Sequence, residues 1–415
     1  AEVSWRDLFN DEQLKSYIAQ GLENNIDIRI ALQNVVAAEA YVKQGKAGYY
    51  PTLSGTASFT RTKNSENSQF GSFFTRPLEQ YELSGSLSWE ADIWGKIRSN
   101  KRAFSASYLQ SVSAHQAVKT NLIASIAATY YQLLALDKQL EVAHQTLEAR
   151  KNSLETTVAL KDAGQVTEVA VKQTEAQVHT TEIIVIDLEN NIKLLENAFS
   201  ILLGEAPQKI QRGTLDDQSI DTELSTGVPY LLLANRPDVM QAEYGLINAF
   251  ELTNVAKSSL YPSLSLSATG GFQSLEFDNW LDASSLFSTL VGSLTQPIFN
   301  GRRLRTQMEV AKAQQEQALL NYKQALLTAG REVSDALYTY EAETEKLEAR
   351  SKELDAYAKA EDYSEELLNN GLANYLEVLT ARQNALNSEL NLVDSQYSRL
   401  SAIVELYRAL GGGWK

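Results

Sequence analysis

The chain contains Lys46-Ala47-Gly48-Tyr49-Tyr50-Pro51-Thr52-Leu53-Ser54, and a closely similar stretch returns as Lys257-Ser258-Ser259-Leu260-Tyr261-Pro262-Ser263-Leu264-Ser265. Other matches keep the same order and nearly the same separation. Asp92-Ile93-Trp94-Gly95-Lys96 is echoed by Pro297-Ile298-Phe299-Asn300-Gly301-Arg302, and Gly164, Tyr131 and Leu203-Gly204 return as Gly371, Tyr338 and Leu410-Gly411. Self-similarity at a fixed separation is the sequence sign of repeated architecture. The sequence therefore predicts a tandem duplication whose halves are joined by a polar linker.

Each half places a helix before its proline and extended segments after it. We expect helices from Glu12 to about Tyr49 and from Tyr230 to about Tyr261, which Pro51 and Pro262 terminate. The next segments alternate apolar and small polar residues: residues 52–60, 81–90, 263–269 and, less regularly, 286–299. Period-two alternation predicts β-strands. It fits membrane-barrel strands, with aromatic residues near their ends, and soluble hairpins with one wet face equally well.

Very long helices follow the second strand of each half. Residues 97–161 contain neither Gly nor Pro, and residues 303–370 contain only Gly330. At about 1.5 Å per residue each helix reaches on the order of 100 Å. Gly164 and Gly371 then break the chain, and helices return over 166–203 and 375–410. These carry heptad seams, which predict coiled-coil packing: Val171, Val178, Val185, Ile192 and Phe199 in the first half, and Leu379, Leu386, Val393, Leu400 and Tyr407 in the second.

Composition excludes several classes of function. The 415 residues carry 37 Lys and Arg against 52 Asp and Glu, a net charge of −15 that repels phosphate backbones and argues against nucleic-acid partners. The most apolar helical stretch, 120–136, contains recurring polar residues, so no transmembrane helix is expected and a membrane role requires β-structure or lipidation. His115, His144 and His179 stand singly and there is no Cys, so we expect no metal site, no cofactor and no catalytic centre.

Four strands per chain are too few to close a barrel, which needs about eight. Open strand edges are not tolerated in lipid, so membrane strands of this kind require several chains to share one barrel. Because the strands continue into the long helices, such an assembly would be a tube and would serve as a conduit.

The order of elements and several motifs resemble the TolC-like outer-membrane efflux proteins. The motifs are Arg236-Pro237-Asp238-Val239 with Ala242-Glu243, and Gln296-Pro297-Ile298-Phe299-Asn300-Gly301. The opening Trp5-Arg6-Asp7-Leu8-Phe9-Asn10-Asp11 and the tip Gly371-Leu372-Ala373-Asn374-Tyr375-Leu376-Glu377-Val378-Leu379 look like the branch that serves resistance-nodulation-division (RND) pumps. The resemblance covers essentially the whole chain.

This resemblance implies a mixed α/β membrane protein that forms a homotrimer. A 12-stranded outer-membrane β-barrel would continue into a 12-helix periplasmic α-barrel. It also implies a periplasmic adapter, an inner-membrane RND transporter and outer-membrane lipid as partners, in a Gram-negative bacterium. Members of this branch often begin with a lipidated Cys, which this sequence does not contain, so a lipid anchor stays open.

The resemblance and the repeat together divide the chain into eight segments. They are an N-terminal segment with the first helix (1–50), the first β-hairpin (51–94), the first helical hairpin (95–204, tip near 164), an equatorial linker (205–228), the second helix (229–261), the second β-hairpin (262–299), the second helical hairpin (300–411, tip near 371) and a C-terminal tail (412–415).

The expected site lies at the tips of the two helical hairpins. The resemblance implies a pore constriction at Leu376, Glu377 and Thr380, and Thr380 departs from the Asp found in many members. We hypothesise that three copies of Glu377 meet at the axis and favour cations, with an outward-facing Glu as the alternative. Glu361 and Glu365 belong to an acidic run that either attracts the adapter or is hydrated surface. The expected adapter contacts are Gly164, Val166, Thr167, Glu168, Gly371, Ala373 and Asn374.

The sequence therefore predicts the outer-membrane channel of a tripartite efflux pump, a passive exit duct for small toxic compounds. A type I protein-secretion duct and a soluble periplasmic coiled-coil scaffold are the alternatives. The exported compound is not specified by the sequence.

Overall fold

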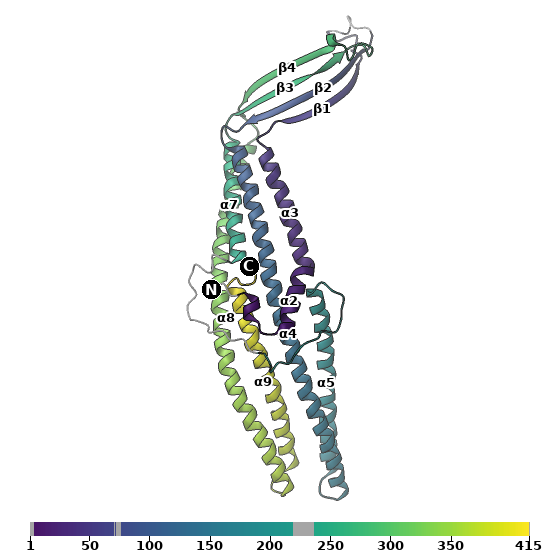
Figure 1. The fold of residues 1–415 in the computed structure, drawn as a ribbon, viewed down its shortest axis with the longest axis vertical. Coiled ribbons are helices and arrows are strands. Elements are labelled where there is room, and N and C mark those ends of the chain that lie inside the picture. The colour runs from purple at the N-terminus through teal and green to yellow at the C-terminus, as the bar shows by residue number, and fades with distance from the viewer. Residues whose placement is uncertain (1–3, 70, 72–75, 219–235, 415) are drawn as a thin grey trace. The chain divides into compact units, whose positions relative to one another are not determined.

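The computed structural model describes residues 4–69, 71, 76–218 and 236–414 (Figure 1). In chain order its elements are α1 (Trp5–Leu8), α2 (Glu12–Asn24), α3 (Ile26–Ala47), β1 (Thr52–Thr62), β2 (Leu78–Ala91), α4 (Lys96–Asp162), α5 (Glu168–Leu202), α7 (Pro237–Ser258), β3 (Ser263–Ser274), the 3₁₀ turn η1 (Ala283–Ser285), β4 (Leu286–Thr295), α8 (Arg303–Asn369) and α9 (Tyr375–Ala409). They form two compact units. Unit 1 comprises residues 1–33, 112–240 and 324–415, and unit 2 comprises residues 34–111 and 241–323.

Two helical hairpins dominate unit 1. The first hairpin is α4 with α5 and the second is α8 with α9 (Figure 1). The long arms α4 and α8 have 67 residues each and the returning arms α5 and α9 have 35 each. The ten expected seam residues of α5 and α9 are all buried, with exposed fractions of 8% or less. Burial of the heptad seam, whose apolar residues recur every 3.5 residues on average, therefore stabilises the packing of α5 and α9 in the hairpins, as the heptads predict.

The core of unit 1 lies where the N-terminal segment packs against the hairpins. Phe9, Ile18, Tyr130, Phe199 and Val404 are fully buried there. The ring of Tyr17, which packs at the edge of this core, meets Phe199 edge to face, with centroids 5.2 Å apart.

A helix break at Asn25 was not expected, because we predicted one continuous helix from Glu12 to Tyr49. Asn25 ends α2 in a non-helical conformation (φ −58°, ψ 132°), and its Oδ1 then accepts the N–H groups of Asp27 and Ile28 at the start of α3. Its Nδ2 donates to the Leu202 carbonyl at the end of α5 at 2.9 Å. An Asn that satisfies backbone groups on both sides stabilises a break that apolar periodicity does not reveal.

The second repeat helix is described only from Pro237 onward. The prediction placed it from Tyr230, whereas α7 begins at Pro237. Residues 230–235, like the end of the expected linker, lie outside the described residues.

Unit 2 contains one antiparallel sheet of four strands in the order β1-β2-β3-β4 (Figure 1). The register places Leu53 opposite Leu87, Leu87 opposite Ala268 and Ala268 opposite Leu290, so one face is apolar across all four strands. The neighbouring row, from Ser54 through Ser86 to Thr269, is polar. The predicted alternation is thus confirmed, although β4 ends at Thr295 and not at Phe299.

The apolar face of the sheet is exposed in the chain as it stands. Leu53, Leu290 and Leu294 have exposed fractions of 77%, 72% and 68%. Aromatic residues gather beside it, where the ring of Tyr81 contacts Phe59 and Phe277 at centroid distances of 4.9 and 5.4 Å. Within the ranges that the structure describes, no helix is both long enough and apolar enough to cross a membrane.

Candidate functional site at the hairpin tips

Both hairpins turn in the same way at their tips. Gly164 and Gly371 adopt positive φ angles of 75° and 73°. The residue after each glycine donates its N–H to a carbonyl five residues earlier, Gln165 to Leu160 at 2.9 Å and Leu372 to Leu367 at 2.8 Å. This pattern closes the last turn of a helix and requires a left-handed residue, which glycine adopts without steric cost. The two repeats therefore build their tips from one motif.

The two tips differ in how the returning helix begins. In the second hairpin Asn374 Oδ1 accepts the Glu377 N–H at 3.1 Å, and Asn374 Nδ2 donates to Glu377 Oε1 at 3.0 Å. In the first hairpin Thr167 occupies the same position but its side chain makes no capping hydrogen bond. An ion pair of 2.9 Å between Lys161 and Glu168 spans that turn instead. The hydrogen bond from Lys161 lowers the pKa of Glu168 and raises the pKa of Lys161.

Two of the three expected constriction residues line a groove between α5 and α9. Leu376 and Thr380 face this groove, and Leu376 is 60% exposed. Across it lie polar and small residues of α5: Gln173, Ala176, Gln177 and Thr180. Glu377 does not line the groove, and it is exposed on the first turn of α9 with Asn374 as its partner.

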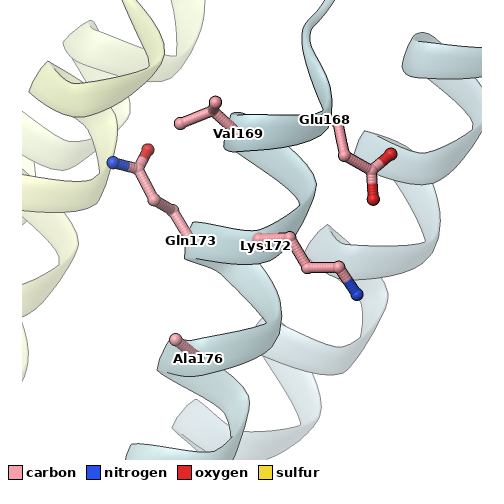
Figure 2. Close-up of a pocket in the computed structure, with 5 residues that line it drawn as sticks. All are labelled: Glu168, Val169, Lys172, Gln173 and Ala176. Atoms are coloured by element: carbon pink, nitrogen blue, oxygen red, sulfur yellow. The ribbon is translucent and has the colours of Figure 1, made fainter.

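A second hollow lies along the first turns of α5. Figure 2 shows Val169 and Gln173 on the side of α5 that faces the coils of the second hairpin, whereas Glu168 and Lys172 point to the other side. Val169 is 64% exposed. Unburied apolar side chains at this spot, beside charged ones, are suited to contact with another protein surface.

The remaining expected tip residues lie on the turns themselves. Gly164, Thr167, Glu168, Gly371 and Asn374 are exposed, and Val166 and Ala373 are half-buried. The structure thus brings the expected contact residues together in two neighbouring turns of unit 1 (Figure 1).

Sequence reasoning missed a pair of arginines that cross-link the hairpins above the tips. Arg382 on α9 donates to Ser153 Oγ on α4 at 2.6 Å, and it also binds Glu365 and lies 3.6 Å from Glu361 on α8. Burial lowers the pKa of Arg382 and raises the pKa of Glu361. These two carboxylates of the acidic run are therefore paired within the chain and are not free for a partner.

Arg150 on α4 is the second of these arginines and is only 4% exposed. It donates to Thr181 Oγ1 and the Gln177 carbonyl on α5 at 2.8 and 3.0 Å, and to Gln383 Oε1 on α9 at 3.1 Å. Burial lowers its pKa, and the charge of Arg382 lowers it further. A buried cation on α4 whose bonds reach α5 and α9 holds these three helices in one arrangement.

A hydroxyl pair joins the hairpins closer to the tips, where Thr174 on α5 hydrogen-bonds Tyr375 on α9. Together with the two arginines it forms what we call the inter-hairpin network: Arg150, Ser153, Thr174, Thr181, Tyr375, Arg382 and Gln383, with Glu361 and Glu365. Among the residues that the structure describes, no group of His, Asp and Glu is arranged to hold a metal ion.

Comparisons with known proteins converge on one family. The family model described as "Outer membrane efflux protein" matches residues 17–205 and 228–412. The cation efflux system protein CusC of Escherichia coli O6:H1 is 28% identical over 414 residues, covering 100% of this chain and 89% of that protein. The solvent efflux pump outer membrane protein SrpC of Pseudomonas putida is 30% identical, covering 99% and 87%. A crystal structure of CusC superposes with a TM-score of 0.90 at 27% identity, covering 100% of this chain and 95% of that one.

Proposed function

Because this chain belongs to the outer membrane efflux protein family, we propose that three copies of it form a passive exit duct that is gated at the hairpin tips. The protein is the outer-membrane channel component of a tripartite efflux pump, and it resides in the outer membrane. The family consists of transport ducts rather than enzymes.

The sheet of unit 2 is the observation that supports a barrel shared by several copies, and the family supports three. Among the described strands, β1 pairs only with β2 and β4 only with β3, so each has one unpaired edge. An unpaired edge leaves backbone groups without partners, which the interior of a bilayer does not tolerate. Three copies joined edge to edge give twelve strands in a closed barrel, and their twelve long helices continue as the periplasmic tube.

Purified protein in detergent tests the assembly directly. We expect a protein mass three times the 46.0 kDa of the chain by light scattering, and channels in planar bilayers. A protein component of a single chain that forms no channels would contradict the proposal.

The groove between α5 and α9 supports a gate at Leu376 and Thr380, because residues of both hairpins line it near their tips. Three copies would bring three such grooves toward one axis. Glu377 lies one step around the helix, and in this proposal its exposed carboxylate adds a ring of negative charge that favours cations.

Substitution of Glu377 by Gln tests the charge without changing the size of the side chain. Planar-bilayer recordings should show reduced cation selectivity, while Thr380→Val should leave selectivity in place and change conductance. Because Glu377 also contacts Asn374, a variant Asn374→Ser, which keeps a capping oxygen, controls for the loss of that contact. Unchanged cation selectivity in Glu377→Gln would exclude the ring.

The exposed turns support docking of a periplasmic adapter. An inner-membrane RND transporter would complete the pump and supply its energy. The exposed, apolar Val169 lies beside the charged Glu168 and the polar Thr167. A photo-reactive residue at position 167 should give an adduct with the adapter in intact cells. The same residue at position 348, on an exposed face of α8, is the matched control.

A further inference from the structure

The two repeats meet within the chain at an aromatic junction just beyond β2. The rings of Trp94 and Tyr261 stack with centroids 4.8 Å apart and planes 27° from parallel. Trp94 Nε1–H also donates to the Pro262 carbonyl at 2.7 Å, and Ser258 Oγ–H donates to the Trp94 carbonyl at 3.0 Å. This junction fastens the end of the first β-hairpin to the start of the second.

The two β-hairpins make matching contacts at the ends that adjoin the helices. Thr52 pairs with Ser88 in the first hairpin, and Ser263 pairs with Thr295 in the second. Trp89 Nε1–H donates to the Tyr49 carbonyl at 3.0 Å. At the matching place Gln296 Nε2–H donates to the Leu260 carbonyl at 3.2 Å. The sequence repeat and this shared contact identify Tyr50 as the counterpart of Tyr261, and Phe299 as the counterpart of Trp94.

These two counterparts are exposed in the single chain. Phe299 is 91% exposed and Tyr50 is 73% exposed, whereas Trp94 and Tyr261 are 48% and 43% exposed. Ile298, next to Phe299, is 96% exposed. Adjacent apolar side chains with so little cover indicate a surface that is buried in an assembly.

We propose that Phe299 of one copy stacks on Tyr50 of the next copy, and so repeats between chains the junction that Trp94 and Tyr261 form within the chain. The end of each second β-hairpin then meets the start of the next copy's first β-hairpin. A head-to-tail contact of this kind gives a closed ring when the rotation between copies closes, as the proposed three-copy barrel requires. The inference rests on the proposed assembly and specifies which residues join its copies.

The strand register agrees with this continuation. Across β2 and β3 the apolar Leu87 faces Ala268, and the polar Ser86 faces Thr269. The leucines of β4 (Leu286, Leu290 and Leu294) lie at even numbers, with Phe287 and Val291 on its other face, and Leu53, Ala57 and Phe59 of β1 lie at odd numbers. Pairing β4 with β1 by the same repeat relation puts these two sets on one face, so the apolar band continues from copy to copy.

The junction between copies has fewer bonds than the junction within the chain. Phe299 has no ring N–H to donate to Pro51, and Ala47 stands where Ser258 supplies a hydroxyl. Ring stacking and burial remain as its attractive contacts. The seam between copies is therefore the weaker of the two kinds of seam.

Paired cysteines test the contact in a chain that has no native Cys. We expect Tyr50→Cys/Phe299→Cys, treated with a short bismaleimide, to give covalent species of two and three chains in a denaturing gel. Trp94→Cys/Tyr261→Cys is the matched control and should cross-link within one chain. Co-expression of the two single variants Tyr50→Cys and Phe299→Cys should give two-chain species, and each single variant alone should give none.

The result that overturns the inference is a particle with the mass of three chains in which the control pair cross-links and the Tyr50/Phe299 pair does not. That result leaves the trimeric duct standing, whereas a particle with the mass of one chain contradicts both proposals. A second measurement uses Ala47→Ser/Phe299→Trp, which transfers the bonds of the internal junction to the outer one. It should raise the temperature at which the trimer dissociates in detergent, and an unchanged or lower temperature counts against the contact.

Discussion

The guanidinium of Arg382 on α9 donates a hydrogen bond of 2.6 Å to Ser153 Oγ on α4, and so joins the two hairpins near their tips. The same guanidinium neutralises Glu361 and Glu365 on α8. A separation of the hairpins must break these bonds, so we expect the inter-hairpin network to resist movement of the tips.

Substitution Arg382→Ala should loosen the tips. It removes the cation paired with Glu361 and Glu365 and leaves only the weaker influence of Arg150 on Glu361, which we expect to cost roughly 2 kcal/mol of local stability. Hydrogen exchange in the first turns of α9 should be about 10- to 30-fold faster, and single-channel conductance should rise. Lys352→Ala removes an exposed ion pair with Glu348 and is the control that should change neither.

The two hairpins offer a matched pair of capping variants. Asn374→Ala removes a side chain that bonds the Glu377 N–H, and should destabilise the start of α9 by about 1 kcal/mol. Thr167→Ala removes a side chain that makes no such bond, so the start of α5 should change little. Hydrogen exchange at the two tips measures the difference, and equal effects would contradict the assignment of Asn374 as a cap.

The pH dependence of the tips should reflect Glu361. Burial, its largest influence, raises the pKa of Glu361 above the ordinary 4.5, and Arg382 acts in the opposite direction. The folded tip thus holds this proton more tightly than the unfolded chain does. Its contribution to stability is present below pH 4.5 and is lost as the pH rises through the folded pKa.

Glu361→Gln stays neutral and should therefore flatten the change in melting temperature between about pH 4.5 and pH 7. Glu345→Gln, at an exposed site on the same helix, should leave the wild-type slope in place. An identical slope in Glu361→Gln and the wild type would refute this account.

Arg236 should be sensitive even to replacement by lysine. Its side chain is 4% exposed, and it donates to the Ala409 carbonyl at 2.8 Å and to Asp238 and Glu332 at 2.7 Å each. Arg236→Ala should cost about 2–3 kcal/mol because it removes the donor to the buried Ala409 carbonyl and to Asp238, while Glu332 keeps Arg408 at 3.5 Å. Arg236→Lys should recover only part of this loss, since one ammonium does not reproduce the fork geometry. Thermal melting followed by circular dichroism checks both variants.

Periodicity in the sequence predicted most of the architecture, because long uninterrupted patterns leave few alternatives. The absence of Pro and Gly from 97–161 and the heptads that follow Val171 and Leu379 indicated helices whose observed ends differ by one or two residues. The alternation after Pro51 and Pro262 indicated the four strands. The break at Asn25 was missed because it depends on the Leu202 carbonyl, far away in sequence.

The sequence predicted where the tip residues lie in the fold, but not the hydrogen bonds between the two hairpins. Thr174, Thr181 and Gln383 are polar residues within apolar heptad seams, and each proves to be a member of the inter-hairpin network. A polar side chain in a coiled-coil seam indicates a buried polar partner, but the seam does not say which one. That Arg150 and Tyr375 are the partners depends on how two distant helices align. The acidic run beginning at Glu361 was interpreted as exposed because the sequence does not show that Arg382, on another helix, pairs with Glu361 and Glu365.

Arms of 67 and 35 residues in both hairpins have a consequence for any change in length. Removing seven residues from each arm of one hairpin keeps its seams in phase but withdraws its tip by about 10 Å relative to the other. Thr174 would then lose Tyr375, and Arg150 would lose Gln383. We therefore expect insertions and deletions to be tolerated only when they occur in both repeats together. The two hairpins can change in length only as a pair.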